Sequence, residues 1–324
     1  MPAAICIGEL LVDFVSLRLD VPLSELPPLQ GAAGGAPANV AVGLARQGVE
    51  SGFVGKVGDD PFGEHLRQAM SEAEVDTSQL LTAPGVRTTL AFVAQRSDGR
   101  KDLCFYRNPG ADMMLAPGDL DAAYLESAQL FHFGSVALSE SPQREAVVEA
   151  VRLARGAGAL ITYDPNWRPW LWRDAAEGKA WIWRMMDAPA VVKLAEEEFE
   201  FVTGTTDLEA GCQRVLDMGP QLVVVTRGAA GCYYRTPRVG GSSPGFAVEV
   251  VDPLGAGDGF MAGLLARLLG AGPPAQMSRA ELDAIMTWAN AAGALTCLGH
   301  GVIPSLPTTD AISRFLDERR HGFE

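Results

Sequence analysis

Short apolar runs alternate along the chain with longer segments whose apolar residues recur every three or four positions. The runs predict buried strands and the periodic segments predict helices, because one face of a helix repeats at that spacing. This alternation predicts an α/β fold in which a mostly parallel central sheet carries helices on both faces. The predicted strands are residues 4–8, 51–55, 130–133, 159–163, 190–194, 222–226 and 245–251, and the predicted helices are one through residue 44 and residues 61–70, 143–155, 175–186, 196–202, 208–218, 255–269, 282–298 and 309–320.

A β-hairpin is predicted where residues 88–95 and 101–107 alternate around the turn Ser97-Asp98-Gly99-Arg100. This hairpin interrupts the βα order. Together with the segment after Val15, it predicts a small sheet that covers a functional site. We therefore expect one domain of residues 1–324, in which residues 12–30 and 88–112 form a β-sheet lid inserted in the α/β core.

The glycine-rich turn before the predicted helix at 255–269 is the strongest candidate for a catalytic site in the sequence. The first turn of a helix leaves backbone N–H groups without partners, and Gly255 and Gly257 let an anion approach them, so we expect phosphate oxygens at Gly255, Ala256 and Gly257. Asp258 follows in the same turn and can accept a proton from an attacking hydroxyl. The alternative is an ordinary capped helix whose aspartate complements the helix dipole.

Two other phosphate motifs are absent from the sequence. A Walker A loop requires a glycine and a lysine followed by serine or threonine, and Gly55-Lys56 is followed by Val57. A dinucleotide fingerprint requires a third glycine where Phe260 stands. The turn at Gly255 is therefore predicted to be a phosphate-binding site with a carboxylate beside it. The missing fingerprint argues against a dinucleotide oxidoreductase.

A second glycine-rich helix start lies early in the chain and is uncharged. Gly34 and Gly35 would let a hydroxyl-rich ligand lie against the backbone, and Asn39 can both donate to and accept from hydroxyls. The alternative is a simple turn before a helix. Arg107, at the end of the hairpin, is a candidate substrate contact or a solvated surface arginine.

Polar residues follow the predicted strands, where the carboxyl ends of parallel strands meet at one edge of the sheet and bind ligands. We therefore expect these clusters to converge on one rim. The clusters are Asp164-Pro165-Asn166, Lys193, Glu198, Thr226-Arg227-Gly228 and the Gly255 turn.

Composition and net charge limit the classes of partner that the chain is expected to bind. The 324 residues are 48% hydrophobic with a net charge of −14, which argues against nucleic acid or an anionic membrane as the main partner. The five cysteines have no metal-ligand spacing, which indicates a reducing cytoplasm. No apolar run approaches the 18 residues of a membrane span, so neither an anchor nor export is expected.

The segments Gly34-Gly35-Ala36-Pro37-Ala38-Asn39-Val40-Ala41 and Gly255-Ala256-Gly257-Asp258-Gly259-Phe260 resemble the two signatures of the ribokinase-like (PfkB-type) carbohydrate kinases. The resemblance extends from Gly8-Glu9 to Ile303-Pro304. Within the family, the first signature and the segments Phe105-Tyr106-Arg107-Asn108-Pro109 and Tyr163-Asp164-Pro165-Asn166 look most like fructokinases. The resemblance implies a ribokinase-like fold and transfer of the γ-phosphate of ATP, with Mg²⁺, to a sugar hydroxyl.

The resemblance also implies roles for individual residues. Asp258 is the implied general base, and the amides of Ala256 and Gly257 form the implied anion hole. The implied sugar contacts are Asp13, Gly34, Gly35, Asn39, Arg107, Asn166 and Arg168, and the implied nucleotide contacts are Lys193, Thr226, Gly228, Gly231 and Asn290.

Metal binding is implied at positions where this sequence departs from the family pattern. Glu198 would contact Mg²⁺ through water, although the asparagine of the family's Asn-x-x-Glu motif is Ala195 here. Asp252 and Ser305 match a site for a monovalent cation such as K⁺, although the usual Asp-Thr-Thr-Gly is Asp252-Pro253-Leu254-Gly255.

The acceptor is expected to be D-fructose. The alternatives are 2-keto-3-deoxygluconate, whose carboxylate Arg107 and Arg168 would grip, an acceptor of the nucleoside or ribose type, and a sugar-sensing protein without catalysis. The resemblance further implies a homodimer that pairs through the lids.

Overall fold

The computed structural model describes residues 1–97 and 101–321. Its centre is a nine-stranded sheet in the order β13-β12-β11-β10-β9-β8-β1-β4-β5. The strands from β11 to β5 run parallel, and β12 and β13 add an antiparallel edge. The nine strands are β1 (Ala4–Ile7), β4 (Ser51–Gly58), β5 (Leu80–Ala83), β8 (Leu130–Gly134), β9 (Leu160–Asp164), β10 (Val191–Ala195), β11 (Leu222–Thr226), β12 (Cys232–Arg235) and β13 (Gly240–Ser243).

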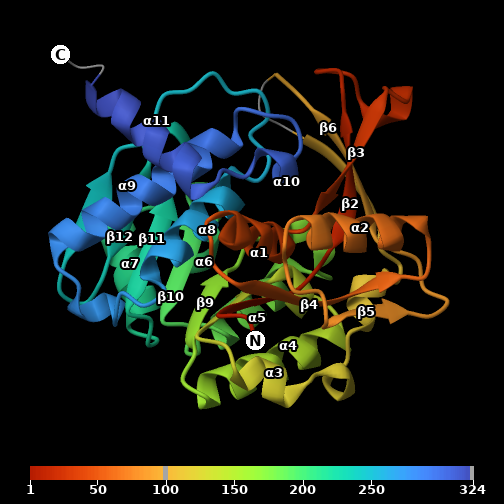
Figure 1. The fold of residues 1–324 in the computed structure, drawn as a ribbon, viewed down its shortest axis with the longest axis horizontal. Helices are drawn as coiled ribbons and strands as arrows, with labels where there is room; N and C mark the ends of the chain where they lie inside the picture. The colour runs from red at the N-terminus through yellow and green to blue at the C-terminus, as the bar shows by residue number, and fades with distance from the viewer. Residues whose placement is uncertain (98–100, 322–324) are drawn as a thin grey trace.

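Helices cover both faces of this sheet, as the alternating pattern predicts (Figure 1). One face packs against α1 (Ala36–Arg46), α2 (Pro61–Glu72), α8 (Ala256–Leu268) and α9 (Arg279–Thr296). The other face packs against α3 (Ala122–Glu126), α4 (Gln143–Gly156), α5 (Ala175–Arg184), α6 (Glu196–Thr203) and α7 (Leu208–Leu216). The short α10 (Val302–Ser305) and α11 (Thr309–His321) end the described chain, in which no helix is long and apolar enough to cross a membrane.

A separate four-stranded sheet, in the order β3-β2-β6-β7, stands at the upper right of Figure 1. Its strands are β2 (Leu11–Ser16), β3 (Leu29–Gly34), β6 (Leu90–Gln95) and β7 (Lys101–Tyr106). The predicted hairpin is confirmed as the antiparallel pair of β6 and β7, although residues 98–100 of its turn lie outside the described residues. This small sheet comes from the two segments that the sequence analysis assigns to the lid.

The expected strand at 245–251 is wrong. Residues 244–250 have no regular structure, and Val250 and Val251 are 55% and 45% exposed. Their β-branched pattern suits a strand, but no neighbouring strand pairs with them in the described chain, and exposed β-branched residues gain little from pairing alone. The turn at Gly255 therefore follows a loop, whereas the other expected polar clusters do lie at or after strand ends. Strands β3, β5, β12 and β13 are not predicted by the apolar pattern, because they are short or contain several glycines.

Helices α1, α8 and α9 approach one another closely through small residues. A Cβ atom placed on Gly43 would lie 2.5 Å from Cβ of Ala262, so a side chain at this position would push α1 away from α8. Between α8 and α9, a Cβ at Gly263 would lie 2.8 Å from Cβ of Ala292. Interiors this dense transmit displacements rather than absorb them. The small residues thus fix how the first turns of α1 and α8 meet.

Candidate active site

The two glycine-rich helix starts meet in the folded chain. Nδ2 of Asn39, in the first turns of α1, donates a hydrogen bond of 2.7 Å to Oδ2 of Asp258, in the first turn of α8. Asn39 is buried, and Asp258 is half-buried at the start of its helix. These residues are 219 positions apart in sequence. The contact brings the candidate hydroxyl-binding segment and the candidate proton acceptor to one point.

The surroundings of Asp258 make it a stronger base than an ordinary aspartate. Burial raises the pKa of its carboxyl to about 6, and the charge of Asp164 adds to the rise. The hydrogen bond from Asn39 and the charges of Lys193 and Arg168 act in the opposite direction. A carboxylate with a pKa near the working pH can accept a proton readily and is still ionised at neutral pH.

This pKa predicts how activity depends on pH. Only the ionised carboxylate accepts a proton, so kcat/KM for the acceptor should fall about tenfold per pH unit below about pH 6 and be flat above it. The measurement is a pH profile of kcat/KM at saturating Mg-ATP. The residual activity of Asp258→Asn should lack this acidic limb, and a native profile that stays flat down to pH 5 would contradict the role of Asp258.

The first turn of α8 has the geometry of an anion seat. Its N-cap residue Gly255 has φ of 78°, and a Cβ there would lie 2.2 Å from Val302, so both the backbone and the space require glycine. The N–H of Ala256 reaches the carbonyl of Pro253 only at 3.5 Å, a long contact. The helix start therefore offers N–H groups to an anion.

Lys193 brings a positive charge to the same turn. Its Nζ lies 3.1 Å from where a Cβ on Gly257 would stand, and 2.8 Å from Oδ2 of Asp164. Burial alone would lower the pKa of this ammonium, but the charges of Asp164 and Glu198 outweigh burial and raise it. Lys193 therefore stays charged beside the helix start, and glycine at 257 leaves room for it.

Glu198 lies at the start of α6 and already has backbone partners. Its two carboxylate oxygens accept hydrogen bonds from the N–H groups of Ala195 (2.8 Å) and Trp167 (2.5 Å). Burial and the charge of Asp164 raise the pKa of Glu198. Oδ1 of Asp164 is buried without a hydrogen-bond partner among the described residues, which suits a group bound from outside. No cluster of three or more metal-ligating side chains occurs in residues 1–97 and 101–321.

The segment at Gly34 and Gly35 packs closely under its neighbours. A Cβ on Gly34 would lie 2.0 Å from Oδ2 of Asp13, so the carboxylate of Asp13 rests directly on this backbone. Gly35 has φ of 114° and caps α1. Oε1 of Glu9 accepts the N–H of Ala36 at 3.1 Å, and burial raises the pKa of Glu9 to about 7. The predicted hydroxyl-binding loop is thus hydrogen-bonded to the carboxylate of Glu9 and lies against the carboxylate of Asp13.

Arg107 is buried, so the interpretation as a solvated surface arginine is wrong. Its guanidinium bonds to Asp112, Ser139 and Gln143. Arg168, in contrast, is half-buried in the loop after β9, where it donates to the carbonyl of Trp167 at 3.1 Å and acts on Asp258 through its charge. Asn166, in the same loop, has a left-handed backbone with φ of 48°. Of these two arginines, Arg168 is therefore the one whose charge acts on the carboxylate of Asp258.

The candidate nucleotide residues lie at the carboxyl end of β11 and beyond. Thr226 ends β11, and Gly228 is exposed with φ of 52° and no described atom within 4 Å of an added Cβ. Gly231 requires glycine because a Cβ there would meet the carbonyl of Ser243 at 2.1 Å. Nδ2 of Asn290 donates to Oγ of Ser243 and to the carbonyl of Pro244. Asn290 thus holds the chain that follows β13.

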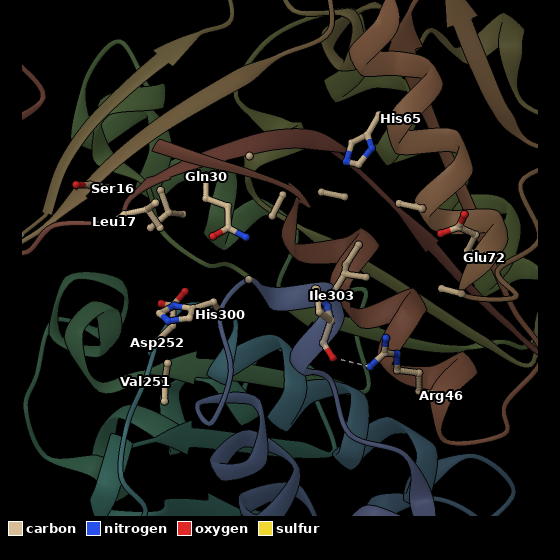
Figure 2. A pocket seen from close by; sticks show the side chains of 18 of the residues that line it. Ser16, Leu17, Gln30, Arg46, His65, Glu72, Val251, Asp252, His300 and Ile303 are labelled. Atoms are coloured by element: carbon tan, nitrogen blue, oxygen red, sulfur yellow. Dashed lines mark hydrogen bonds between the residues drawn. The ribbon is translucent and has the colours of Figure 1, made fainter. Parts of the chain in front are cut away.

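A cavity of about 750 Å³ lies beside this site, between β2 and β3 of the small sheet and the loop that leads into α10. Figure 2 shows Gln30 of β3 and both Asp252 and His300 among the side chains that line it. Asp252 is buried, and its Oδ1 accepts the N–H of Leu254. Ser305, the other candidate for a monovalent cation, ends α10 but does not line the cavity.

The structure therefore brings Asn39, Asp258, Lys193, Asp164 and Arg168 together. The sequence predicts no separate role for Asp164, although this residue stands before Pro165 at a predicted strand end. Neither Asp112 nor the capping role of Glu9 is predicted, because a single acid in an irregular segment gives no periodic signal.

Comparison with known proteins identifies relatives over nearly the whole chain. A family model described as pfkB family carbohydrate kinase matches residues 1–309. Fructokinase-1 of Oryza sativa subsp. japonica is 40% identical over 311 residues, which are 96% of this chain and 96% of the rice protein. The fructokinase of Xylella fastidiosa with bound ATP matches with a TM-score of 0.90 at 31% identity, covering 99% of this chain and 100% of that chain.

A second solved structure gives the same fold with other ligands. It is a double mutant of the fructokinase from Vibrio cholerae O395 in the fructose, ADP and potassium ion bound form. It matches with a TM-score of 0.86 at 34% identity and covers 98% of both chains. These likenesses agree with the architecture described above.

Proposed function

Because the chain belongs to the pfkB family of carbohydrate kinases, we propose that it transfers the γ-phosphate of ATP to a hydroxyl of D-fructose. The observation that carries this proposal is the 2.7 Å hydrogen bond between Asn39 and Asp258. This bond joins the segment of residues 34–39, which suits sugar hydroxyls, to a carboxylate in the first turn of α8, where an anion can bind. The fructokinases among the similar proteins support fructose as the acceptor.

In the proposed reaction, Asp258 accepts the proton of the attacking hydroxyl as the oxygen bonds to phosphorus. Asn39 keeps the carboxylate oriented. The amides of Ala256 and Gly257 and the ammonium of Lys193 stabilise the negative charge on the transferred phosphoryl group. Asp13, Gly34, Gly35, Asn166 and Arg168 would hold the sugar.

ATP would lie along the rim from the start of α8 to the loop after β11. Gly228 leaves open space there, and Thr226, Gly231 and Asn290 would shape the nucleotide end of the site. The fructokinase of Xylella fastidiosa with bound ATP supports this nucleotide. ADP must leave after transfer, and an exposed rim permits that.

Mg²⁺ bound to the nucleotide would neutralise phosphate charge in a chain whose net charge is −14. The free Oδ1 of Asp164 and the carboxylate of Glu198 fit such an ion, which usually retains several waters and takes only one or two protein carboxylates. A monovalent cation such as K⁺ would bind near Asp252 and Ser305. The potassium ion in the structure of the Vibrio cholerae relative supports this choice.

Glu198→Gln tests the metal contact. The amide keeps one acceptor for the N–H of Ala195 or Trp167 but loses the charge, so we expect the Mg²⁺ concentration for half-maximal rate to rise several-fold, since a water-mediated contact is modest. The measurement is rate against free Mg²⁺ at fixed ATP. Glu197→Gln, exposed in the same helix turn, is the matched control. An unchanged titration in Glu198→Gln would remove Glu198 from the metal site.

The acceptor is tested by a coupled assay of ADP release over a panel of sugars with Mg-ATP. We expect kcat/KM to be highest for D-fructose. A preference for ribose or a nucleoside would assign the chain to another acceptor class, and ADP release with no sugar in the panel would favour a sensing role. The decisive comparison is D-fructose against 2-keto-3-deoxygluconate under identical conditions.

The small sheet would act as a lid that excludes water when sugar binds, since an open site invites hydrolysis of ATP. The cavity between β3 and α10 leaves room for this sheet to move. The face of the sheet opposite Asp13 carries aromatic rings: Phe14 and Phe92 stack at 5.1 Å, and the 66% exposed Tyr106 meets Phe92 edge-on at 5.4 Å. Phe62 of α2 packs against Phe14 at 5.9 Å, so the exposed part of this face is its Tyr106 end. An exposed aromatic ring suits contact with a second copy.

We therefore expect a homodimer whose lids pair through Phe14, Phe92 and Tyr106. Tyr106→Asp places a charge in this aromatic face and should give a monomer at micromolar concentration, measured by analytical ultracentrifugation. Met218→Asp, at an exposed site beside α7, is the control that should leave the dimer intact. A native chain that is monomeric and fully active at that concentration would refute lid pairing.

The chain is proposed to work in the cytoplasm. All five cysteines are free, and four of them are buried. Free thiols are the usual state in a reducing compartment.

A further inference from the structure

We propose that Asp112 is a specificity-determining residue: by neutralising Arg107 it restricts the acceptor to uncharged sugars and excludes sugar acids. This inference rests on the proposed sugar kinase activity. It concerns the charge that the acceptor carries, which neither the family nor the catalytic carboxylate determines.

Arg107 and Asp112 form a buried ion pair. Nε and Nη2 of Arg107 lie 2.9 and 2.8 Å from the same oxygen, Oδ2 of Asp112, and the two side chains are 5% and 0% exposed. The other nitrogen contacts are Nη1 to Oγ of Ser139 at 3.2 Å and Nη2 to Oε1 of Gln143 at 3.0 Å. The Nε–Nη2 edge of the guanidinium, which could bind a ligand carboxylate, is therefore already bonded to Asp112. A ligand carboxylate would have to replace Asp112 to bind there.

Asp112 is itself held in place from the lid. Its Oδ1 accepts the hydroxyl of Thr89 at 2.5 Å, and the carbonyl of Thr89 accepts the N–H of Val12, the residue before Asp13. Asp112 begins no long helix and lies in the short 3₁₀ turn Ala111–Met114. Thr89 thus connects the ion pair to the strand that carries Asp13, the proposed sugar contact.

The ion pair also lies beside the loop at Gly35. The charges of Arg107 and Asp112 both act on the carboxyl of Glu9, whose Oε1 binds the N–H of Ala36. With Arg107 paired to Asp112, the guanidinium offers no uncompensated positive charge on this side of the proposed acceptor site. A sugar acid would find no counter-ion in this pair, and a charge taken out of water without a counter-ion is strongly disfavoured.

Asp112→Asn tests the inference because the amide keeps the shape and an acceptor oxygen while it leaves the guanidinium without a counter-charge. We expect kcat/KM for 2-keto-3-deoxygluconate, relative to D-fructose, to rise about tenfold to a hundredfold, the range of a hydrogen bond to a charged group. The control is Asp119→Asn, which removes the acid of the half-buried Lys56–Asp119 pair and should leave this ratio unchanged. A ratio that does not move in folded Asp112→Asn overturns the inference.

The double variant Arg107→Gln with Asp112→Asn keeps the test decisive if the single variant does not fold, because it leaves no unpaired buried charge. We expect it to phosphorylate D-fructose within a few-fold of the native rate and to gain nothing toward the sugar acid. Loss of fructose phosphorylation in the folded double variant would show that Arg107 grips the acceptor directly and would overturn the inference. Failure of the native chain to phosphorylate fructose would instead refute the proposed function, so the two failures are distinguishable.

Discussion

Asp258→Asn is expected to lower kcat by about 10²–10⁴-fold, the usual contribution of a general base. The amide keeps the shape of the side chain, and its oxygen can still accept the hydrogen bond from Nδ2 of Asn39. It cannot take the proton of the attacking hydroxyl. The affinity for ATP should stay near native because the amides of α8 and Lys193 are unchanged, and equilibrium binding of ATP measures this.

Stability provides a second measurement for the same variant. Burial raises the pKa of Asp258, which means that the fold disfavours its ionised form. That cost is absent at pH values below the unfolded pKa and present above about pH 6. The neutral asparagine should therefore be at least as stable as the native chain at pH 7, measured by urea unfolding. Loss of activity with unchanged or increased stability separates a catalytic role from a structural one.

The matched control is Asp207→Asn, because Asp207 also lies at a helix start, where it caps α7 through the N–H of Ala210. Asparagine caps helices as well as aspartate does, so this variant should retain native kcat. If Asp258→Asn behaved like Asp207→Asn, the residue would only complement the helix dipole, and the proposed base would have to be sought elsewhere.

Lys193→Met is expected to lower the free energy of unfolding by about 3–5 kcal/mol, because it leaves a buried carboxylate without its counter-ion. Lys193 and Asp164 have side chains only 5% and 4% exposed and their charged atoms lie 2.8 Å apart. The variant also removes a positive charge from the start of α8. We therefore expect kcat/KM for Mg-ATP to fall by about tenfold to a hundredfold in the protein that still folds.

A second variant separates the two effects of Lys193. Lys193→Met with Asp164→Asn removes both charges of this ion pair, so most of the stability should return while kcat/KM stays low. Lys56→Met breaks the less deeply buried pair with Asp119 and should cost less stability than Lys193→Met, because water screens that pair more. Urea unfolding and steady-state kinetics on the same preparations provide both readouts. Full recovery of activity in the double variant would contradict a role for Lys193 at the phosphate.

The main sheet and most helices follow from local pattern, and the reason is physical. Parallel strands such as β10 and β11 are buried on both faces, so they appear as continuous apolar runs. The helices between them show the spacing of one covered face. The residue types at the two glycine-rich starts carry equally local information, since glycine adopts the φ of 114° at Gly35 and of 78° at Gly255 without steric cost.

What the sequence could not provide are contacts between distant residues. The β-branched residues at 245–251 resemble a strand, but pairing requires a neighbour, and in the described chain that place is taken by β13 beside β12. Arg107 could not be placed because its partners lie 5, 32 and 36 positions away in three different segments. Burial of a lone arginine depends on such partners rather than on any pattern around it.

The close approach of α1, α8 and α9 through Gly43, Ala262 and Gly263 has a consequence for the range of acceptors that this scaffold can evolve to use. Asn39 and Asp258 lie on α1 and α8, whose spacing is fixed by their close contact. The distance between these two side chains therefore cannot increase unless the core repacks. A larger or branched sugar must be accommodated from above, by strands β2, β3, β6 and β7. Directed evolution toward new acceptors should therefore accumulate substitutions in the small sheet and spare the helix crossing beneath it.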